Sequence, residues 1–369
     1  MSLFSNQQPT IGLTLDRINT ELAKVLKGKI QSQGPLTFRD FMAVALYDQA
    51  NGFYALGPNI GNPDGPFDTN AKFPAFGYAI AQAIDHAEKN IGCPLRILEL
   101  GGGTGQLGSS IRSFLQYPHE YVVLETSPGL RAIQEQRGLQ TIQNLNNFPP
   151  CPTFVLGNEV LDSLPVHRVM GIGNEEVVEL YVDLDEDGEF FEHPGCLSTS
   201  ELADRFRYEG VQLGRGQVAE ICLDLKPFFQ NLWQVLERGY VIFVDYGDRA
   251  SNLYSHRHRN GRLRSYYQQQ QIHDPFFAVG QQDLTADVDY TAAISVAKEV
   301  GFEVDGPIPQ GAWLRNLGIQ AYKGSAGDRE SDQEEVNVLT KQAGLGSTFD
   351  VLILKTRGLP KGPGLRPES

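Results

Sequence analysis

The sequence predicts an α/β fold in which helices wind on both sides of an open, mostly parallel sheet, the arrangement called doubly wound. From residue 95 onward, short apolar runs alternate with segments of helical spacing, as such a sheet requires. The first run, Arg96–Leu100, suits a parallel strand that is covered on both faces. It opens directly into a Gly-rich turn at residues 101–105, which is typical of the passage from a strand to a helix.

An N-terminal section precedes the sheet. Residues 11–30 and 38–47 have helical spacing, and Thr37 is a plausible N-cap of the second segment. A Gly/Pro-dense loop at residues 56–66 is a candidate lid. A further helix, at residues 75–90, leads to the first strand.

The alternation then predicts the remaining elements in order. Strands are expected at residues 97–100, 122–125, 153–156, 240–244, 302–304 and 348–354, and helices at residues 107–115, 129–136, 225–236 and 290–300. Two insertions interrupt this pattern. The first contains a hairpin around Asp185 to Gly188, and the second, at residues 248–289, is polar and Gln-rich.

These elements divide the chain into five segments. They are an N-terminal helical section with the lid loop (1–75), a first half of the α/β domain (76–170), an inserted hairpin and helical element (171–224), a second half (225–357, with the insertion 248–289) and a loose tail (358–369).

Composition limits the classes of partner. The chain has 369 residues, of which 41% are hydrophobic, enough for a sizeable core. Its net charge is −14, from 45 acidic and 31 basic side chains, and this argues against a nucleic-acid partner. An acidic protein can instead steer a cationic substrate toward itself.

Cysteine usage and the first residues bear on location. The four cysteines form no C-x-x-C pair, so neither a metal site nor a disulfide framework is indicated. No apolar run approaches the roughly 18 residues that a membrane span needs. The first 35 residues lack a charged start followed by an apolar core, so we expect no signal peptide and a cytoplasmic location.

The turn after the first strand has two ligand interpretations. A carboxylate, Glu99, followed by Gly101, Gly103 and Gly105 suits S-adenosylmethionine (SAM), a cationic ligand without phosphate. Residues 103–108 also form a literal G-x-G-x-x-G, the dinucleotide fingerprint, and Glu125 serves the ribose in either case. SAM is favoured, because Glu99 would oppose a pyrophosphate and two glycines separate the strand from the fingerprint.

Polar residues follow four of the predicted strands. They are Glu99, Glu125, Asn158 with Glu159, and Asp245 with Tyr246. Ligands of open α/β sheets lie outside the carboxyl ends of the strands. Four polar ends exceed what core packing asks for, so the pattern predicts an enzyme.

Several blocks together resemble the MidA family of methyltransferases. The blocks are GPLTFRDFM at 34–42, NGFY at 51–54, ELGGGTGQL at 99–107, NEVLDSLPVH at 158–167, DLTADVDY at 283–290 and WLRNLGI at 313–319. They occur in the family's order and cover residues 34 to 320. Two departures stand out. Residues 65–72 read GPFDTNAK where the family has G-D-F-x-T-S-P-E, and the glycine loop reads G-G-G-T-G instead of G-P-G-R-G.

The resemblance implies a Rossmann-like class I methyltransferase that uses SAM and methylates an arginine of a partner protein, because the family includes the mitochondrial methyltransferase that assembles respiratory complex I. A homodimer is left open. The cofactor residues it implies are Glu99, Gly101, Gly103, Gly105, Gln106, Leu107, Glu125, Thr126 and Asn158. Two other functions stay open: methylation of a small molecule, and a non-catalytic assembly or binding factor.

An arginine acceptor needs carboxylates that orient its planar guanidinium. We predict Glu159 and Asp162 as this clamp, with Asn158 holding the cofactor or the acceptor. The alternative is that both carboxylates cap a helix after the strand. His167 is a candidate proton relay, although a structural role is the commoner one for a lone histidine.

Further polar residues are expected around the site. Asp245 and Tyr246 are predicted to shape the wall of the pocket, and Asp283, Asp287 and Asp289 to form a rim for a basic peptide. Capping of the following helix explains Asp289 equally well. The basic stretch at residues 254–264 is either a solvated loop or a docking surface.

Overall fold

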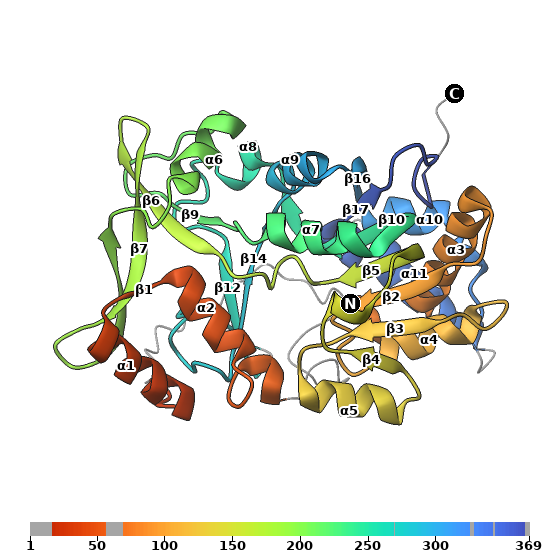
Figure 1. Ribbon diagram of the computed structural model, residues 1–369, viewed down its shortest axis with the longest axis horizontal. Helices are drawn as coiled ribbons and strands as arrows, with labels where there is room; N and C mark the ends of the chain where they lie inside the picture. Colours follow the sequence, from red (N-terminus) through yellow and green to blue (C-terminus); the bar gives the residue numbers. More distant parts are fainter. Residues whose placement is uncertain (1–16, 57–68, 269, 325–327, 342–343, 366–369) are drawn as a thin grey trace.

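The fold is known from a computed structural model, which describes residues 17–56, 69–268, 270–324, 328–341 and 344–365. Its larger sheet has seven strands in the order β16-β17-β10-β5-β2-β3-β4 (Figure 1). The strands are β2 (Arg96–Leu100), β3 (Tyr121–Leu124), β4 (Gln140–Ile142), β5 (Cys151–Asn158), β10 (Leu236–Asp245), β16 (Glu303–Pro309) and β17 (Asp350–Lys355). β10, β5, β2, β3 and β4 pair in parallel, whereas β17 runs antiparallel to both of its neighbours. The sheet is therefore mixed, with β17 running against the direction of its neighbours.

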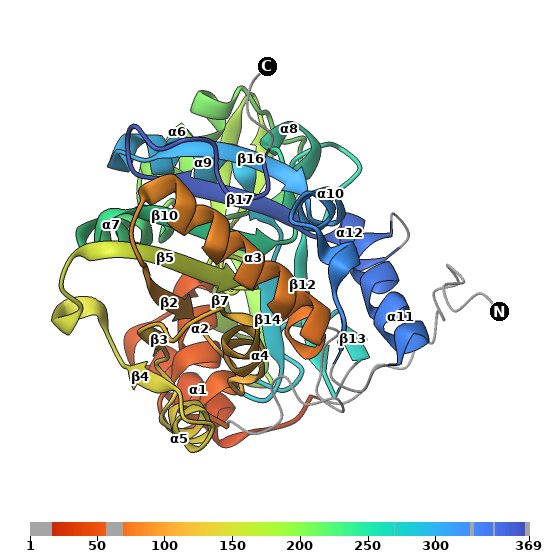
Figure 2. The same ribbon diagram turned by 90° about the vertical axis from the view of Figure 1, so that its right-hand side faces the viewer.

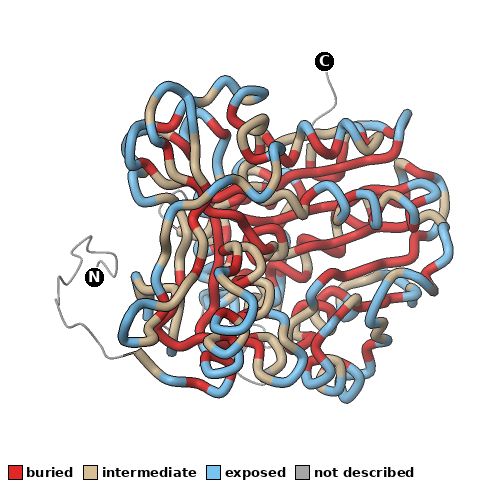
Figure 3. The backbone as a smooth tube through the Cα atoms, turned by 60° about the vertical axis from the view of Figure 1, so that its left-hand side comes forward, coloured by how far each residue is buried: buried red, intermediate tan, exposed pale blue. Residues whose placement is uncertain are grey.

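Two hydrophobic clusters pack helices against the two faces of this sheet (Figure 2). One face is covered by α3 (Pro74–Ile91), α4 (Gln106–Phe114), α10 (Gln310–Asn316) and α11 (Arg329–Thr340), and the other by α7 (Leu225–Val235) and α9 (Tyr290–Val300). Consecutive residues of a strand point to opposite faces of the sheet, so Ile97 packs against the first group of helices and Leu98 against the second. The strands form the buried centre of the molecule, as the tube in Figure 3 shows.

The segment 167–221 and a short strand of the N-terminal section build a second sheet beside the first. It comprises β1 (Leu36–Thr37), β6 (His167–Gly173), β7 (Glu176–Leu184), β8 (Phe190–Gly195) and β9 (Val218–Ile221). The N-terminal helices α1 (Glu21–Gln33) and α2 (Phe38–Tyr47) pack on it through a third cluster, which includes Phe41, Val182 and Phe190. The N-terminal section thus belongs to the body of the protein.

Shorter elements complete the chain. They are α5 (Pro128–Gln136), α6 (Glu201–Glu209), α8 (Ala250–Leu253), α12 (Leu345–Thr348), the single turns η1 (Phe53–Leu56), η2 (Asn70–Lys72), η3 (Leu145–Asn147) and η4 (Ile319–Ala321), and the strands β11 (Gly247–Asp248), β12 (Leu263–Tyr267), β13 (Gln270–Ile272), β14 (Asp283–Ala286) and β15 (Val288–Asp289). β14 runs antiparallel to β12, and its first residue, Asp283, lines the same cavity as residues at the ends of β2 and β5.

Most expected elements appear close to their predicted bounds. The helix at 38–47 begins at its predicted cap, where Thr37 accepts a hydrogen bond from Asp40 N, and the hairpin around residues 185–188 joins β7 to β8. The lid loop at 56–66 lies almost wholly outside the described residues. The five-segment division of the chain stays a prediction.

The expectation of a loose tail is wrong for residues 358–365. The indole N–H of Trp313 donates to Pro363 O (2.8 Å), and the hydroxyl of Tyr240 donates to Pro360 O (3.1 Å). Leu359 is buried in the core of the first face. Buried donors on α10 and β10 need acceptors, and the carbonyls of this Pro/Gly-rich segment supply them.

No helix in the described part of the chain is both long and apolar enough to cross a membrane.

Candidate functional site

The Gly-rich loop between β2 and α4 takes backbone conformations that favour glycine. Gly101 and Gly103 have φ values of 60° and 52°, and Gly105, at 76°, is the N-cap of α4. The loop is tied to the next strand, since Gly101 N donates to Leu124 O (2.9 Å). Its main chain therefore lies open along the edge of a cavity at the carboxyl ends of the strands.

Gly105 differs from the two other glycines because it does not line the cavity. A Cβ atom placed on it would lie 2.8 Å from Leu139 Cδ1, whereas one on Gly188, which has the same φ of 76°, would meet nothing within 4 Å. Gly105 is thus required for packing beneath the loop.

Replacing Gly105 by alanine is expected to destabilise the protein more than the matched change Gly188→Ala. Both variants carry the cost of a left-handed alanine, roughly 1–2 kcal/mol. Only Gly105→Ala adds a steric conflict, which costs a further 1–3 kcal/mol or so. Urea unfolding of the two variants measures this difference, and equal losses would contradict the packing role.

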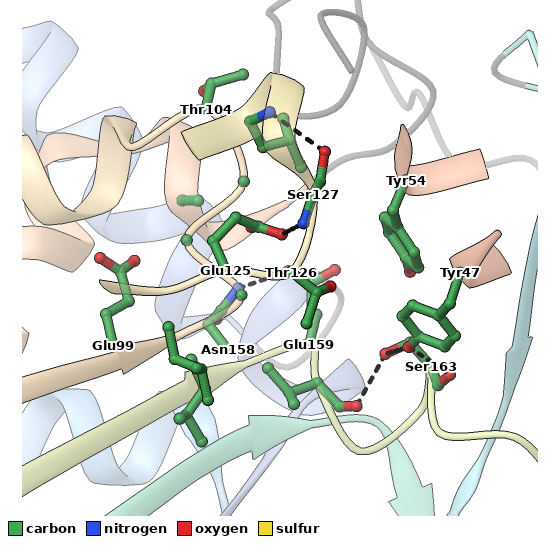
Figure 4. A pocket seen from close by; sticks show the side chains of 18 of the residues that line it. Tyr47, Tyr54, Glu99, Thr104, Glu125, Thr126, Ser127, Asn158, Glu159 and Ser163 are labelled. Carbon is green, nitrogen blue, oxygen red and sulfur yellow. Dashed lines mark hydrogen bonds between the residues drawn. The ribbon is translucent and has the colours of Figure 1, made fainter. Parts of the chain in front are cut away.

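Two carboxylates flank the glycine loop (Figure 4). Glu125, directly after β3, lines the cavity and accepts hydrogen bonds from Ser127 N (2.9 Å) and Gln134 Nε2 (3.3 Å). Glu99 also lines the cavity, and its Oε2 accepts a hydrogen bond from the Tyr121 hydroxyl (2.8 Å). Burial raises the pKa of Glu99 to about 7 and raises the pKa of Glu125 as well.

Asn158 is the last residue of β5 and Glu159 follows it, and both line the cavity. Glu159 has a φ of 55°, a left-handed conformation that is uncommon for a side chain of this kind. Its Oε1 accepts hydrogen bonds from Thr69 Oγ1 (2.7 Å) and Asn158 Nδ2 (2.8 Å). Such strained residues cluster at functional sites, where their surroundings hold them in place.

Asp162 is buried and faces the same cavity as Glu159. Residues 159–166 form turns and lead into strand β6, so no helix follows that these carboxylates might cap. Asp245 holds this segment instead: its Oδ2 accepts from the backbone N–H groups of Val160 (3.1 Å) and Leu161 (2.8 Å). Asp245 itself does not line the cavity, whereas Tyr246 does.

Apart from Asp283, the residues of the opposite wall were not predicted from the sequence. This wall consists of Tyr47 from α2 and Tyr54 from η1, whose rings stack with centroids 5.3 Å apart (Figure 4). The Tyr47 hydroxyl donates to Ser163 O (2.9 Å), and the Tyr54 hydroxyl donates to Asp283 Oδ1 (3.3 Å). Burial raises the pKa of Asp283 to about 7. The only available sequence signal was the NGFY block, which contains Tyr54.

The resulting cavity has a volume of about 540 Å³ and an acidic lining. Its described lining residues include six carboxylates and no lysine, arginine or histidine; the six are Asp48, Glu99, Glu125, Glu159, Asp162 and Asp283. Buried carboxylates without a cationic partner are costly, because desolvation disfavours their charged form. A cationic guest would offset that cost.

Other predicted residues lie elsewhere. His167, the candidate proton relay, is outside the cavity lining and pairs through Nδ1 with Glu179 Oε1 (2.7 Å) in the second sheet. Asp287 pairs with Arg262 and Arg264 of the basic stretch, and Asp289 caps α9. The structure thus brings eight of the nine predicted cofactor residues to the cavity, Gly105 excepted, together with Asn158, Glu159 and Asp162 of the predicted catalytic set.

Comparisons with known proteins agree with this architecture. A family model described as "Putative S-adenosyl-L-methionine-dependent methyltransferase" matches residues 77–308. The mitochondrial protein arginine methyltransferase NDUFAF7 of Danio rerio is 27% identical over 352 residues, which cover 82% of this chain and 78% of that protein. Its Drosophila melanogaster homologue is 24% identical, covering 94% and 88%. A protein from Burkholderia thailandensis, solved bound to S-adenosyl-homocysteine, superposes with a TM-score of 0.84 at 26% identity over 94% of this chain and 95% of its own.

The comparisons also correct one expectation. We predicted a cytoplasmic location, but the curated relatives are named as mitochondrial proteins. That prediction is wrong on this finding. Composition and the first residues of the chain say little about the cellular compartment, because targeting signals are recognised by receptors and do not depend on the fold.

Proposed function

Because the chain belongs to this family of SAM-dependent methyltransferases, we propose that its acceptor is the guanidinium of an arginine in a partner protein. The observation that carries the proposal is the acidic cavity: its described lining has six carboxylates and no basic side chain. The relatives named above are protein arginine methyltransferases. Both SAM and arginine are cations, so both suit such a lining.

The residues at the end of the cavity next to the glycine loop fit the cofactor. We assign Glu125 to the ribose hydroxyls, the main chain of Gly101 and Gly103 to close approach, and Asn158 to the methionine portion. Glu99, which accepts a hydrogen bond from the Tyr121 hydroxyl, adds a further carboxyl group to this end of the cavity. We keep the neighbouring lining residues in the cofactor set, namely Gln106, Leu107 and Thr126. When bound, the cofactor would supply a methyl group from a sulfonium centre, whose S–C bond breaks so that the cofactor leaves as a neutral thioether.

The other end of the cavity suits the acceptor. We assign Glu159 and Asp162 to the guanidinium nitrogens and the ring faces of Tyr47 and Tyr54 to its planar surface. As the new N–C bond forms, the arginine nitrogen must lose a proton, and Glu159 is the carboxylate that we assign to accept it. Holding the acceptor in line with the methyl group supplies most of the catalysis.

The segment that departs from the family pattern still reaches this site. Its described part begins at Thr69, which donates to Glu159 as described above. We therefore favour an active enzyme over a non-catalytic assembly factor. We further propose that the partner protein belongs to a respiratory complex, as the family resemblance implies. We also propose that the large sheet is doubly wound and Rossmann-like. A role for nucleic acid is disfavoured by the net charge of −14.

A labelling experiment separates the function classes. SAM labelled on its transferable methyl is incubated with the protein and a lysate from cells that lack it, and the label is followed into protein and small-molecule fractions. We expect label in a protein band. Label in small molecules alone would move the assignment to that class of acceptor, and no label despite measured SAM binding would favour an assembly factor.

A further inference from the structure

A chain of three side-chain amides connects the first residue of helix α10 to Glu159. Gln310, the first residue of α10, donates from Nε2 to Asn70 Oδ1 (3.0 Å). Asn70 donates from Nδ2 to Asn158 Oδ1 (3.4 Å), and Asn158 donates from Nδ2 to Glu159 Oε1 (2.8 Å). These residues come from three elements that are remote in the sequence, namely α10, η2 and β5.

The direction of every bond in this chain follows from its last member. Glu159 Oε1 accepts from Asn158, so the Asn158 side chain presents its NH₂ group to that oxygen. Its oxygen then faces Asn70, which must present its own NH₂ group, and the same reasoning fixes Gln310. The carbonyls of Leu339 and Leu345, 3.4 and 3.5 Å from Gln310 Nε2, also require a donor at that end.

Because two of these amides are buried, the loss of one hydrogen bond in the chain cannot be made up by water. Asn70 and Gln310 are fully buried, and neither side chain has access to water that would replace a lost partner. Amide dipoles aligned head to tail polarise one another, which strengthens the donor at the end of the chain. Unlike Asn158, Asn70 and Gln310 are not needed for contact with a ligand, because neither lines the cavity.

We infer that Asn70 and Gln310 are positioning residues for methyl transfer. Through Asn158 they fix the position of the Glu159 carboxylate, whose backbone is left-handed, and they favour its ionised form. This inference rests on the role proposed for Glu159. It assigns to α10, some 150 residues away in the sequence, a part in the chemistry of the site.

The test compares Gln310→Met, which keeps the length of the side chain and removes its donor, with Gln333→Met, the same change on the exposed face of α11. We expect Gln310→Met to lower kcat for methyl transfer roughly tenfold, less than loss of a direct donor would, with the Kd for SAM unchanged. Gln333→Met should match the wild type. The Glu159 carboxyl, followed by NMR, should titrate at a higher pH in Gln310→Met than in the wild type.

A second variant excludes a merely structural role. Gln310→Glu lacks a donor when ionised, but its protonated form can donate an O–H to Asn70. Its activity relative to the wild type should therefore rise as the pH is lowered, whereas that of Gln310→Met should fall, because its Glu159 is protonated at a higher pH. If Gln310→Met does not fold, Asn70→Asp is measured in its place, with the same recovery expected at low pH.

These experiments distinguish failure of the inference about Gln310 from failure of the proposed function. Folded Gln310 variants with wild-type kcat and an unchanged Glu159 titration would overturn the inference, whatever the acceptor is. A wild-type enzyme that methylates something other than arginine would overturn the proposed function alone, since the Gln310 effect is still measurable on that acceptor. The NMR titration needs no turnover, so it decides the inference even in an inactive protein.

Discussion

Replacing Glu159 by glutamine is expected to lower kcat/KM for methyl transfer about a hundredfold, the loss typical of a group that stabilises developing charge. The substitution keeps the shape of the side chain, and a glutamine oxygen can still accept from Thr69 and Asn158. Folding should therefore survive. What disappears is the negative charge that orients the guanidinium and accepts its proton. Initial rates with labelled SAM and the identified acceptor measure the effect.

The matched control is Glu186→Gln, an exposed position in the β7–β8 turn. It removes the same charge far from the cavity lining and should leave the rate unchanged. The Kd for SAM should be nearly equal in the wild type and both variants. A Glu159→Gln enzyme with more than half of the wild-type activity would show that the clamp has been assigned to the wrong residue.

The second large effect concerns stability and pH. Burial raises the pKa of Asp283 to about 7, far above its value in an unfolded chain. The folded state then holds a proton that the unfolded state has already lost, so stability present below about pH 4 is lost progressively as the pH rises through about 7. Removing the ionisable group should abolish this part of the pH dependence.

Asp283→Asn is therefore expected to match the wild type below about pH 4 and to become more stable than the wild type as the pH rises from there to about 7, by about 1.4 kcal/mol for each pH unit and a few kcal/mol in all. The same variant should bind the cationic acceptor less well, since it removes charge from the cavity wall. Urea unfolding at several pH values tests this. Asp187→Asn, at an exposed turn, controls for the overall change in net charge; equal curves for the two variants would contradict the account of Asp283.

Local patterns predicted much of the large sheet and its helices. The run at Arg96–Leu100, the Thr37 cap and the hairpin turn all depend on neighbours within a few residues, and the structure contains them. The second sheet was not predicted as a whole, because β1 pairs with β7 across about 145 residues of sequence. The tail was misjudged for the same reason, since its partners are buried donors on distant elements.

The site divides in the same way. The glycine loop, Glu125 and the Asn158–Asp162 segment follow strand ends, which the topology of the sheet brings together. Tyr47 and Tyr54 reach the cavity only because the N-terminal section folds back onto it. His167 lies only a few residues beyond Asp162, yet strand β6 carries it into the other sheet. Proximity in sequence was therefore a poor guide to proximity in space.

The most direct test of the central claim is the identity of the methylated residue. The labelled protein acceptor is hydrolysed to amino acids, and the labelled product is identified by chromatography and mass spectrometry. An acidic cavity that binds a guanidinium predicts a methylated arginine, absent when Glu159→Gln replaces the wild-type enzyme. Label on lysine, histidine or a carboxyl group would contradict it.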